Sequence, residues 1–251
     1  MSIASCMANK RVHATIVGFV GLFATSAFTF AQDKSKAPPD PPYQIAGTNH
    51  VIVGVIWDEA MLRKMLPAGV KPVKEFTGAF NIYQASRGYG ITPYNAVYAW
   101  ADVEGFDSAD GAKGRWMLAG AYGPDEKTTT AARDIMGFPA RNGTSILEET
   151  TEGRRATGLV NGQPVVVAEV KSSALPCSAA AGTLNYPVQI KGKILVNQIP
   201  FSGDWCAAEP VSLKIVAPAG DVFATLVPAK VVWAGEFRNG AFAFIRPVPR
   251  H

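Results

Sequence analysis

Short runs rich in β-branched and aromatic residues recur from residue 50 to residue 247, and this pattern constrains the fold more than any other feature. The first run, 50–57, is continuously apolar, which is typical of a strand buried on both faces. The pairs Asn161-Gly162 and Asn239-Gly240 predict two-residue hairpin turns, because both residue types tolerate a positive φ. Further strands are expected at 79–85, 95–103, 116–122, 145–150, 154–160, 164–171, 188–200, 211–217, 222–227, 230–236 and 241–247.

Two short helices are expected between these runs. Asp58 is placed to cap a helix over 59–66 that Pro67 ends, and a second helix is expected over 125–136, before Gly137. Helices and strands do not alternate, which argues against a doubly wound α/β fold. The sequence therefore predicts a mainly β domain, an antiparallel barrel or sandwich with two short helices.

A targeting signal is predicted at the N-terminus. Lys10 and Arg11 precede an uncharged run, 14–30, that is followed by Ala31. This arrangement is typical of a secretory signal peptide over 1–31. A retained membrane anchor is the alternative, although the run is near the short end of what spans a bilayer. The mature protein is expected to be periplasmic or secreted, without stable membrane association.

The mature chain is expected to consist of a proline-rich linker at 32–48 and one folded domain at 49–251. Removing Lys10 and Arg11 from the 24 basic residues leaves 22, against 20 acidic ones. So small a charge gives no electrostatic case for binding nucleic acid or an anionic membrane. The sequence leaves open whether the chain forms a homo-oligomer.

Few residues suit the common catalytic chemistries. After processing, the cysteines are Cys177 and Cys206, and an oxidising compartment favours a disulfide between them, with two buried free thiols as the alternative. The remaining histidines are His50 and His251, too few for a histidine-based metal site or a Ser-His-Asp triad. His50 is interpreted as a structural side chain, and no metal or cofactor is expected.

Four segments, taken in order along the chain, are similar to the acetoacetate decarboxylase family. They are "HVIVGVIWDEAMLRKMLPAGVKP", "GYGITPYNAVYAW", "ARDIMGFPARNG" and "LNYPVQIKGKILVNQIP". The resemblance implies a closed, cone-shaped antiparallel β-barrel around a small apolar pocket. It also implies a chemistry in which a neutral lysine attacks the ketone of a β-keto acid and forms an imine.

The chemical positions of the family depart from its pattern in this chain. The reactive lysine falls on Ala140 and its cationic neighbour on Arg141. The pocket glutamate falls near Tyr94, and an early arginine falls near Thr48. Because alanine cannot form an imine, the family's chemistry is not expected here in its usual form.

The first hypothesis is a secreted protein whose pocket binds a small carboxylate or keto acid without imine chemistry. Arg141 would hold the carboxylate, while Tyr94, Phe138 and Trp100 would wall the cavity. A solvated loop position for Arg141 is the alternative.

Two other hypotheses remain open. The chain is an active lyase, a decarboxylase or hydratase, with a relocated lysine for which Lys191 and Lys193 are candidates, although a solvated strand face is favoured for both. Alternatively, it is a structural protein of the cell envelope.

Overall fold

The structure, a computed structural model, describes residues 37–123 and 125–250, so the expected signal peptide lies outside the described residues. Its helical elements are α1 (Glu59–Met65), α2 (Glu126–Thr130), the π-helical segment η1 (Ala131–Ile135) and the 3₁₀ turn η2 (Val222–Thr225). Its strands are β1 (Tyr43–Trp57), β2 (Thr77–Tyr89), β3 (Asn95–Val103), β4 (Gly114–Gly123), β5 (Ala140–Glu149), β6 (Gly153–Val160), β7 (Gln163–Ser172), β8 (Ser178–Ile190), β9 (Lys193–Ile215), β10 (Pro228–Phe244) and β11 (Val248–Pro249). None of the described helices has the length and apolar character needed to cross a membrane.

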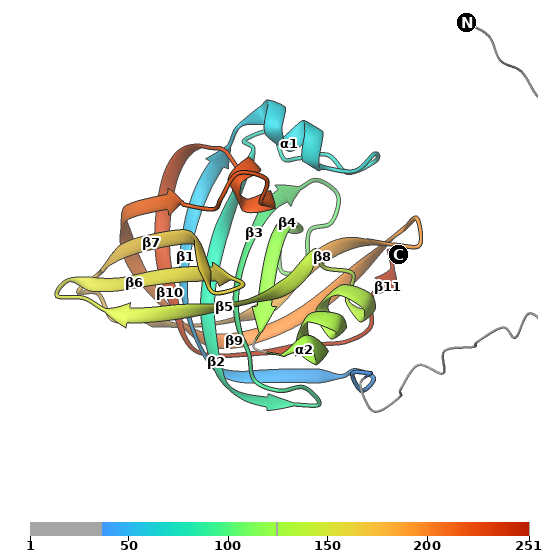
Figure 1. Cartoon of the computed structure of the whole chain (residues 1–251), viewed down its shortest axis with the longest axis horizontal. Coiled ribbons are helices and arrows are strands. Elements are labelled where there is room, and N and C mark those ends of the chain that lie inside the picture. Colours follow the sequence, from blue (N-terminus) through green and yellow to red (C-terminus); the bar gives the residue numbers. More distant parts are fainter. Residues whose placement is uncertain (1–36, 124, 251) are drawn as a thin grey trace, which may run out of the picture. The chain divides into compact units, whose positions relative to one another are not determined.

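Nine strands close into a ring, in the order β10-β1-β2-β3-β4-β5-β6-β7-β9 with β9 paired back to β10 (Figure 1). The strands β8 and β11 pair with β9 outside this ring. The prediction of a mainly β, closed sheet with two short helices is confirmed. One pair, β4 and β5, is parallel rather than antiparallel. A parallel pair needs a crossover connection, and the segment containing α2 and η1 supplies it.

Several predicted elements are confirmed closely. The strand over 95–103 has the bounds of β3, and Asn161 and Gly162 both have positive φ in the turn between β6 and β7. Asp58 caps α1, because its side chain accepts a hydrogen bond from the Met61 amide at 2.8 Å. The helix expected over 125–136 is present as α2 continued by η1.

Four predictions about the extent or type of an element are wrong. β1 begins at Tyr43, inside the predicted linker, because the extension pairs with both β2 and β10. Lys191 adopts φ of 50° and turns the chain between β8 and β9, where one strand was expected. The segment after Asp221 is the 3₁₀ turn η2 rather than a strand, because that carboxylate caps it. β10 runs through Asn239 as an irregularity instead of ending in a hairpin.

Two hydrophobic clusters fill the domain. One is mainly aliphatic and receives Val51, Val53 and Val55 from β1, whereas the other is rich in aromatic residues. Successive side chains on a strand point to opposite faces. His50 and Ile52 accordingly lie on the other face of β1, where they line a cavity.

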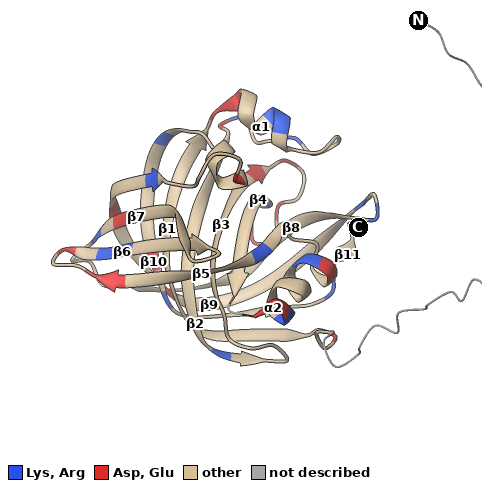
Figure 2. Ribbon diagram, viewed as in Figure 1, with Lys and Arg blue, Asp and Glu red and all other residues tan. Residues whose placement is uncertain are grey.

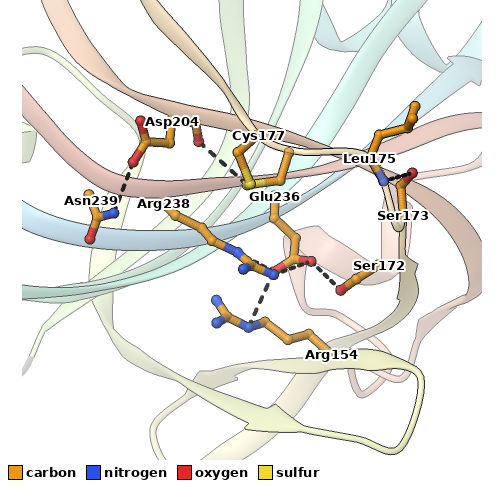
Figure 3. Close-up of a disulfide and its surroundings, with 10 residues drawn as sticks. Arg154, Ser172, Ser173, Leu175, Cys177, Asp204, Glu236, Arg238 and Asn239 are labelled. Carbon is orange, nitrogen blue, oxygen red and sulfur yellow. Dashed lines mark hydrogen bonds and ion pairs between the residues drawn. A yellow bond between two sulfur atoms is a disulfide. The ribbon is translucent and has the colours of Figure 1, made fainter.

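Cys177 and Cys206 form a disulfide that joins the start of β8 to β9 (Figure 3). Cys206 lies opposite Glu236 in the β9–β10 pair. The Glu236 carboxylate is fully buried and accepts hydrogen bonds from Ser172 Oγ at 2.5 Å and Arg238 Nη2 at 2.9 Å. Arg154 Nε lies 3.2 Å from the same carboxylate. This buried ion cluster therefore links β6, β7 and β10 where the ring closes.

Candidate functional site

A cavity of about 180 Å³ lies between the sheet and β8. Much of its wall is apolar, and a smaller cavity of about 30 Å³ shares the side chains of His50, Tyr98 and Phe242 with it. The polar residues of the larger cavity come from adjacent strands: Asn81 from β2, Tyr98 from β3 and Arg115 from β4. Its aromatic wall includes Phe201 and Trp205 from β9 and Phe237 and Phe242 from β10.

Arg115 is the cation of this cavity. Its guanidinium carbon lies 4.6 Å from the centre of the Trp100 ring, and its Nη1 donates a long hydrogen bond of 3.5 Å to the Tyr186 hydroxyl. Asp102 lies opposite Arg115 in the β3–β4 ladder, but among residues 37–123 and 125–250 no carboxylate forms an ion pair with Arg115. The Asp102 carboxylate accepts hydrogen bonds from Trp100 Nε1 at 3.1 Å and from Thr77 Oγ1 at 2.7 Å. A guanidinium stays charged at every physiological pH, so Arg115 offers unused donors to the cavity.

A chain of hydrogen bonds runs along the same cavity wall. The Thr48 hydroxyl donates to His50 Nε2 at 2.9 Å, and His50 Nδ1 donates to Asn81 Oδ1 at 3.0 Å. Asn81 Nδ2 donates to the Tyr98 hydroxyl at 2.8 Å, and this hydroxyl lies 3.3 Å from that of Tyr186. His50 is therefore fully hydrogen-bonded, which agrees with its structural interpretation, although its ring also lines the cavity.

Burial keeps the tyrosines and the histidine that line the two cavities neutral. It raises the pKa of Tyr83, Tyr98 and Tyr122 well above 10 and that of Tyr94 to about 12. The phenols therefore remain protonated hydrogen-bond donors. Burial lowers the pKa of His50 from 6.5 to about 4, against the hydrogen bond with Asn81, which raises it.

The His50 pKa predicts a loss of stability in mild acid. As the pH falls below 6.5, His50 binds a proton in the unfolded chain before it does so in the folded protein. Its contribution to the free energy of unfolding is therefore complete above pH 6.5 and fully lost below about pH 4. The loss is on the order of 3 kcal/mol in the free energy of unfolding. Urea unfolding across this range would measure it. In His50→Gln the free energy should change less between pH 6.5 and pH 5, above the carboxylate titrations; equal slopes in both proteins would contradict the assignment.

The structure brings together some of the residues that the sequence singled out. Tyr94 and Phe138 both line the smaller cavity, and Trp100 lies beneath Arg115. Arg141 does not join them. Its two Nη atoms donate to the Asp221 carboxylate at 2.8 and 2.5 Å, beside a separate surface depression. The role of carboxylate anchor that the sequence assigned to Arg141 therefore has no geometric support.

The position expected for a reactive lysine carries no amine. Ala140 begins β5 and is 6% exposed within the aromatic cluster. All ten lysines in the described part of the chain are exposed, including Lys191 and Lys193 at the β8–β9 turn, seen as the blue hairpin tip in Figure 2. The described residues also contain no group of three or more His, Cys, Asp or Glu side chains that could hold a metal ion.

Sequence reasoning missed Arg115, Asn81 and Tyr186 as cavity residues. A weak signal was present, because Tyr94, Tyr98 and Trp100 are an even number of residues apart and Arg115 is two residues before the buried Met117. Residues two apart on a strand share a face. Nothing in the sequence distinguishes this arginine from one that faces solvent.

Comparisons with known proteins agree with this architecture. No protein-family model matches the sequence, and neither does any curated protein sequence. Among solved structures, acetoacetate decarboxylase from Legionella pneumophila matches with a TM-score of 0.67 and 14% identity, over 85% of this chain and 88% of that one. The enduracididine biosynthesis enzyme MppR, with HEPES buffer bound, matches with a TM-score of 0.65 and 14% identity, over 86% and 89%. An acetoacetate decarboxylase-like enzyme from Sphingomonas wittichii RW1 matches with a TM-score of 0.57 and 16% identity, over 84% and 94%. The described domain therefore has the fold of acetoacetate decarboxylase.

Proposed function

We propose that this chain is an exported binding protein for small apolar monocarboxylates, including keto acids, and that it works without imine chemistry. The observation that carries the proposal is the Arg115 guanidinium, which lines a mainly apolar cavity and has no carboxylate partner among the described residues. Arg115 is half-buried and is recorded with one hydrogen bond, to Tyr186, so a bound carboxylate could accept paired, charge-assisted hydrogen bonds from its remaining donors.

The cavity wall indicates the rest of the ligand. Phe201, Trp205 and Phe237 offer apolar surface to a branched or aromatic body, while Arg115 holds the carboxylate. Pockets of this kind combine a mostly hydrophobic lining with a few polar groups that fix orientation. A volume of about 180 Å³ suits an acid of modest size.

Two observations support binding rather than imine formation. Alanine occupies the position expected for the family's lysine, and every described lysine is exposed and lines neither of the two cavities. MppR has been described in complex with pyruvate, which supports the idea that this fold can hold a small carboxylate.

Titration calorimetry with 4-methylpentanoate tests the proposal, with 4-methylpentan-1-ol as an uncharged control of similar shape. We expect the acid to bind and the alcohol to bind at least about tenfold more weakly, because hydrogen bonds to a charged group contribute about 1.5 to 3 kcal/mol. Borohydride treatment in the presence of acetoacetate, followed by mass spectrometry, should give no lysine adduct. Equal binding of the alcohol, or an adduct on any lysine, would overturn the proposal.

A further inference from the structure

The hydroxyl groups of Tyr98 and Tyr186 carry two protons, and the described residues supply a hydrogen-bond acceptor for one of them. Asn81 Oδ1 accepts from His50, so the Asn81 amide donates to the Tyr98 oxygen at 2.8 Å. An arginine donates only, so the Tyr186 oxygen accepts from Arg115 Nη1 at 3.5 Å. The two tyrosine hydroxyls then share a single hydrogen bond of 3.3 Å. Whichever of them donates it, the other keeps a free O–H group.

This free hydroxyl lies where the two cavities meet. Tyr98 lines both cavities, Tyr186 lines the smaller one and Arg115 lines the larger one. A space of about 30 Å³ has room for a group the size of a water molecule or an oxygen atom, but not for a ring. No described side chain accepts a hydrogen bond from this spare proton. A ligand oxygen would satisfy it.

We infer that the Tyr98–Tyr186 pair selects acids with an oxygen next to the carboxylate, that is, 2-oxo or 2-hydroxy acids. This inference rests on the proposed function. The guanidinium fork of Arg115 takes both oxygens of the carboxylate in the larger cavity. The spare tyrosine hydroxyl, one hydrogen bond away from the guanidinium, then donates to the third oxygen. An acid without that oxygen leaves the buried hydroxyl unpaired, which lowers its affinity.

Two matched ligands test the inference by calorimetry: 4-methyl-2-oxopentanoate and 4-methylpentanoate, which differ at carbon 2 alone. The unmodified protein should bind the oxo acid about tenfold more tightly, the value of one such hydrogen bond. The double variant Tyr98→Phe/Tyr186→Phe should lose this preference and keep its affinity for 4-methylpentanoate. Each single variant leaves one hydroxyl in place and should keep part of the preference.

The control is Tyr43→Phe, which removes a hydroxyl that lines neither of the two cavities and donates to the Pro39 carbonyl oxygen. This variant should retain the full preference. Thermal unfolding of each variant shows whether it is folded. A preference that persists in the folded double variant, or an equal loss of both acids, would overturn the inference. Equal binding of the two acids by the unmodified protein would overturn it and leave the proposed function standing, whereas binding of neither would contradict the proposed function itself.

Discussion

Arg115→Met is expected to weaken the binding of 4-methylpentanoate by about 30- to 5,000-fold. Removing one partner of a buried, hydrogen-bonded charge pair costs about 2 to 5 kcal/mol of binding free energy. Methionine has a similar length and can still pack on Trp100, so the change removes the charge and leaves most of the packing. Calorimetry of the two proteins with the same acid measures the effect directly.

The same variant separates binding from stability. In the unliganded protein Arg115 contacts the Trp100 ring and Tyr186 but forms no ion pair with a described carboxylate, so its loss should lower the melting temperature only slightly. Arg141→Met is the matched control: it breaks the ion pair with Asp221 on another part of the surface and should leave acid binding unchanged. A loss of binding in Arg141→Met, with normal binding in Arg115→Met, would return the anchor role to Arg141.

Glu236→Gln is expected to lower the free energy of unfolding by about 3 to 5 kcal/mol, the usual cost of breaking a buried ion pair from one side. The Glu236 carboxylate is 0% exposed, and Arg154 and Arg238 both lie within 3.2 Å of it. Glutamine keeps the shape and removes the charge, so both guanidinium groups lose their buried counter-ion (Figure 3). Urea unfolding, with the midpoint and slope fitted separately, measures the change.

Glu149→Gln provides the control for this variant. Glu149 pairs with the same Arg154 at 2.6 Å, but its side chain is 73% exposed. Exposed ion pairs contribute about 0 to 1 kcal/mol, so this variant should be nearly neutral. If the two variants lose the same free energy, burial of Glu236 adds nothing to the pairing, and the ring closure must depend on the strand ladders alone.

The sequence predicted most of the strands because their signal is local. The runs at 95–103, 154–160 and 164–171 have the β-branched content and flanking turn residues that strands require, and β3, β6 and β7 follow them closely. The errors arose where contacts between residues far apart in the sequence determine the local structure. Tyr43 extends β1 because two neighbouring strands are present to pair with it. Lys191 adopts a positive φ, which the presence of a lysine does not predict.

The candidate site was predictable only in part. Family resemblance pointed to Tyr94 and Phe138, and both lie in one cavity. It also pointed to Arg141, because sequence position alone does not show that Asp221, 80 residues away, takes up this guanidinium. Arg115 could not be identified in the same way, since its proposed role depends on the lack of an ion-pair partner among the described residues around it. A missing counter-charge is a property of three-dimensional packing.

The outward placement of the described lysines also has a practical consequence. Reagents that couple to amines will attach to the exterior of the domain, on side chains such as Lys171, Lys191 and Lys214, none of which lines the two cavities. The domain can therefore be tethered to a sensor through these amines, with the residues that line both cavities left chemically untouched. Affinities measured on such a surface should agree with those measured in free solution.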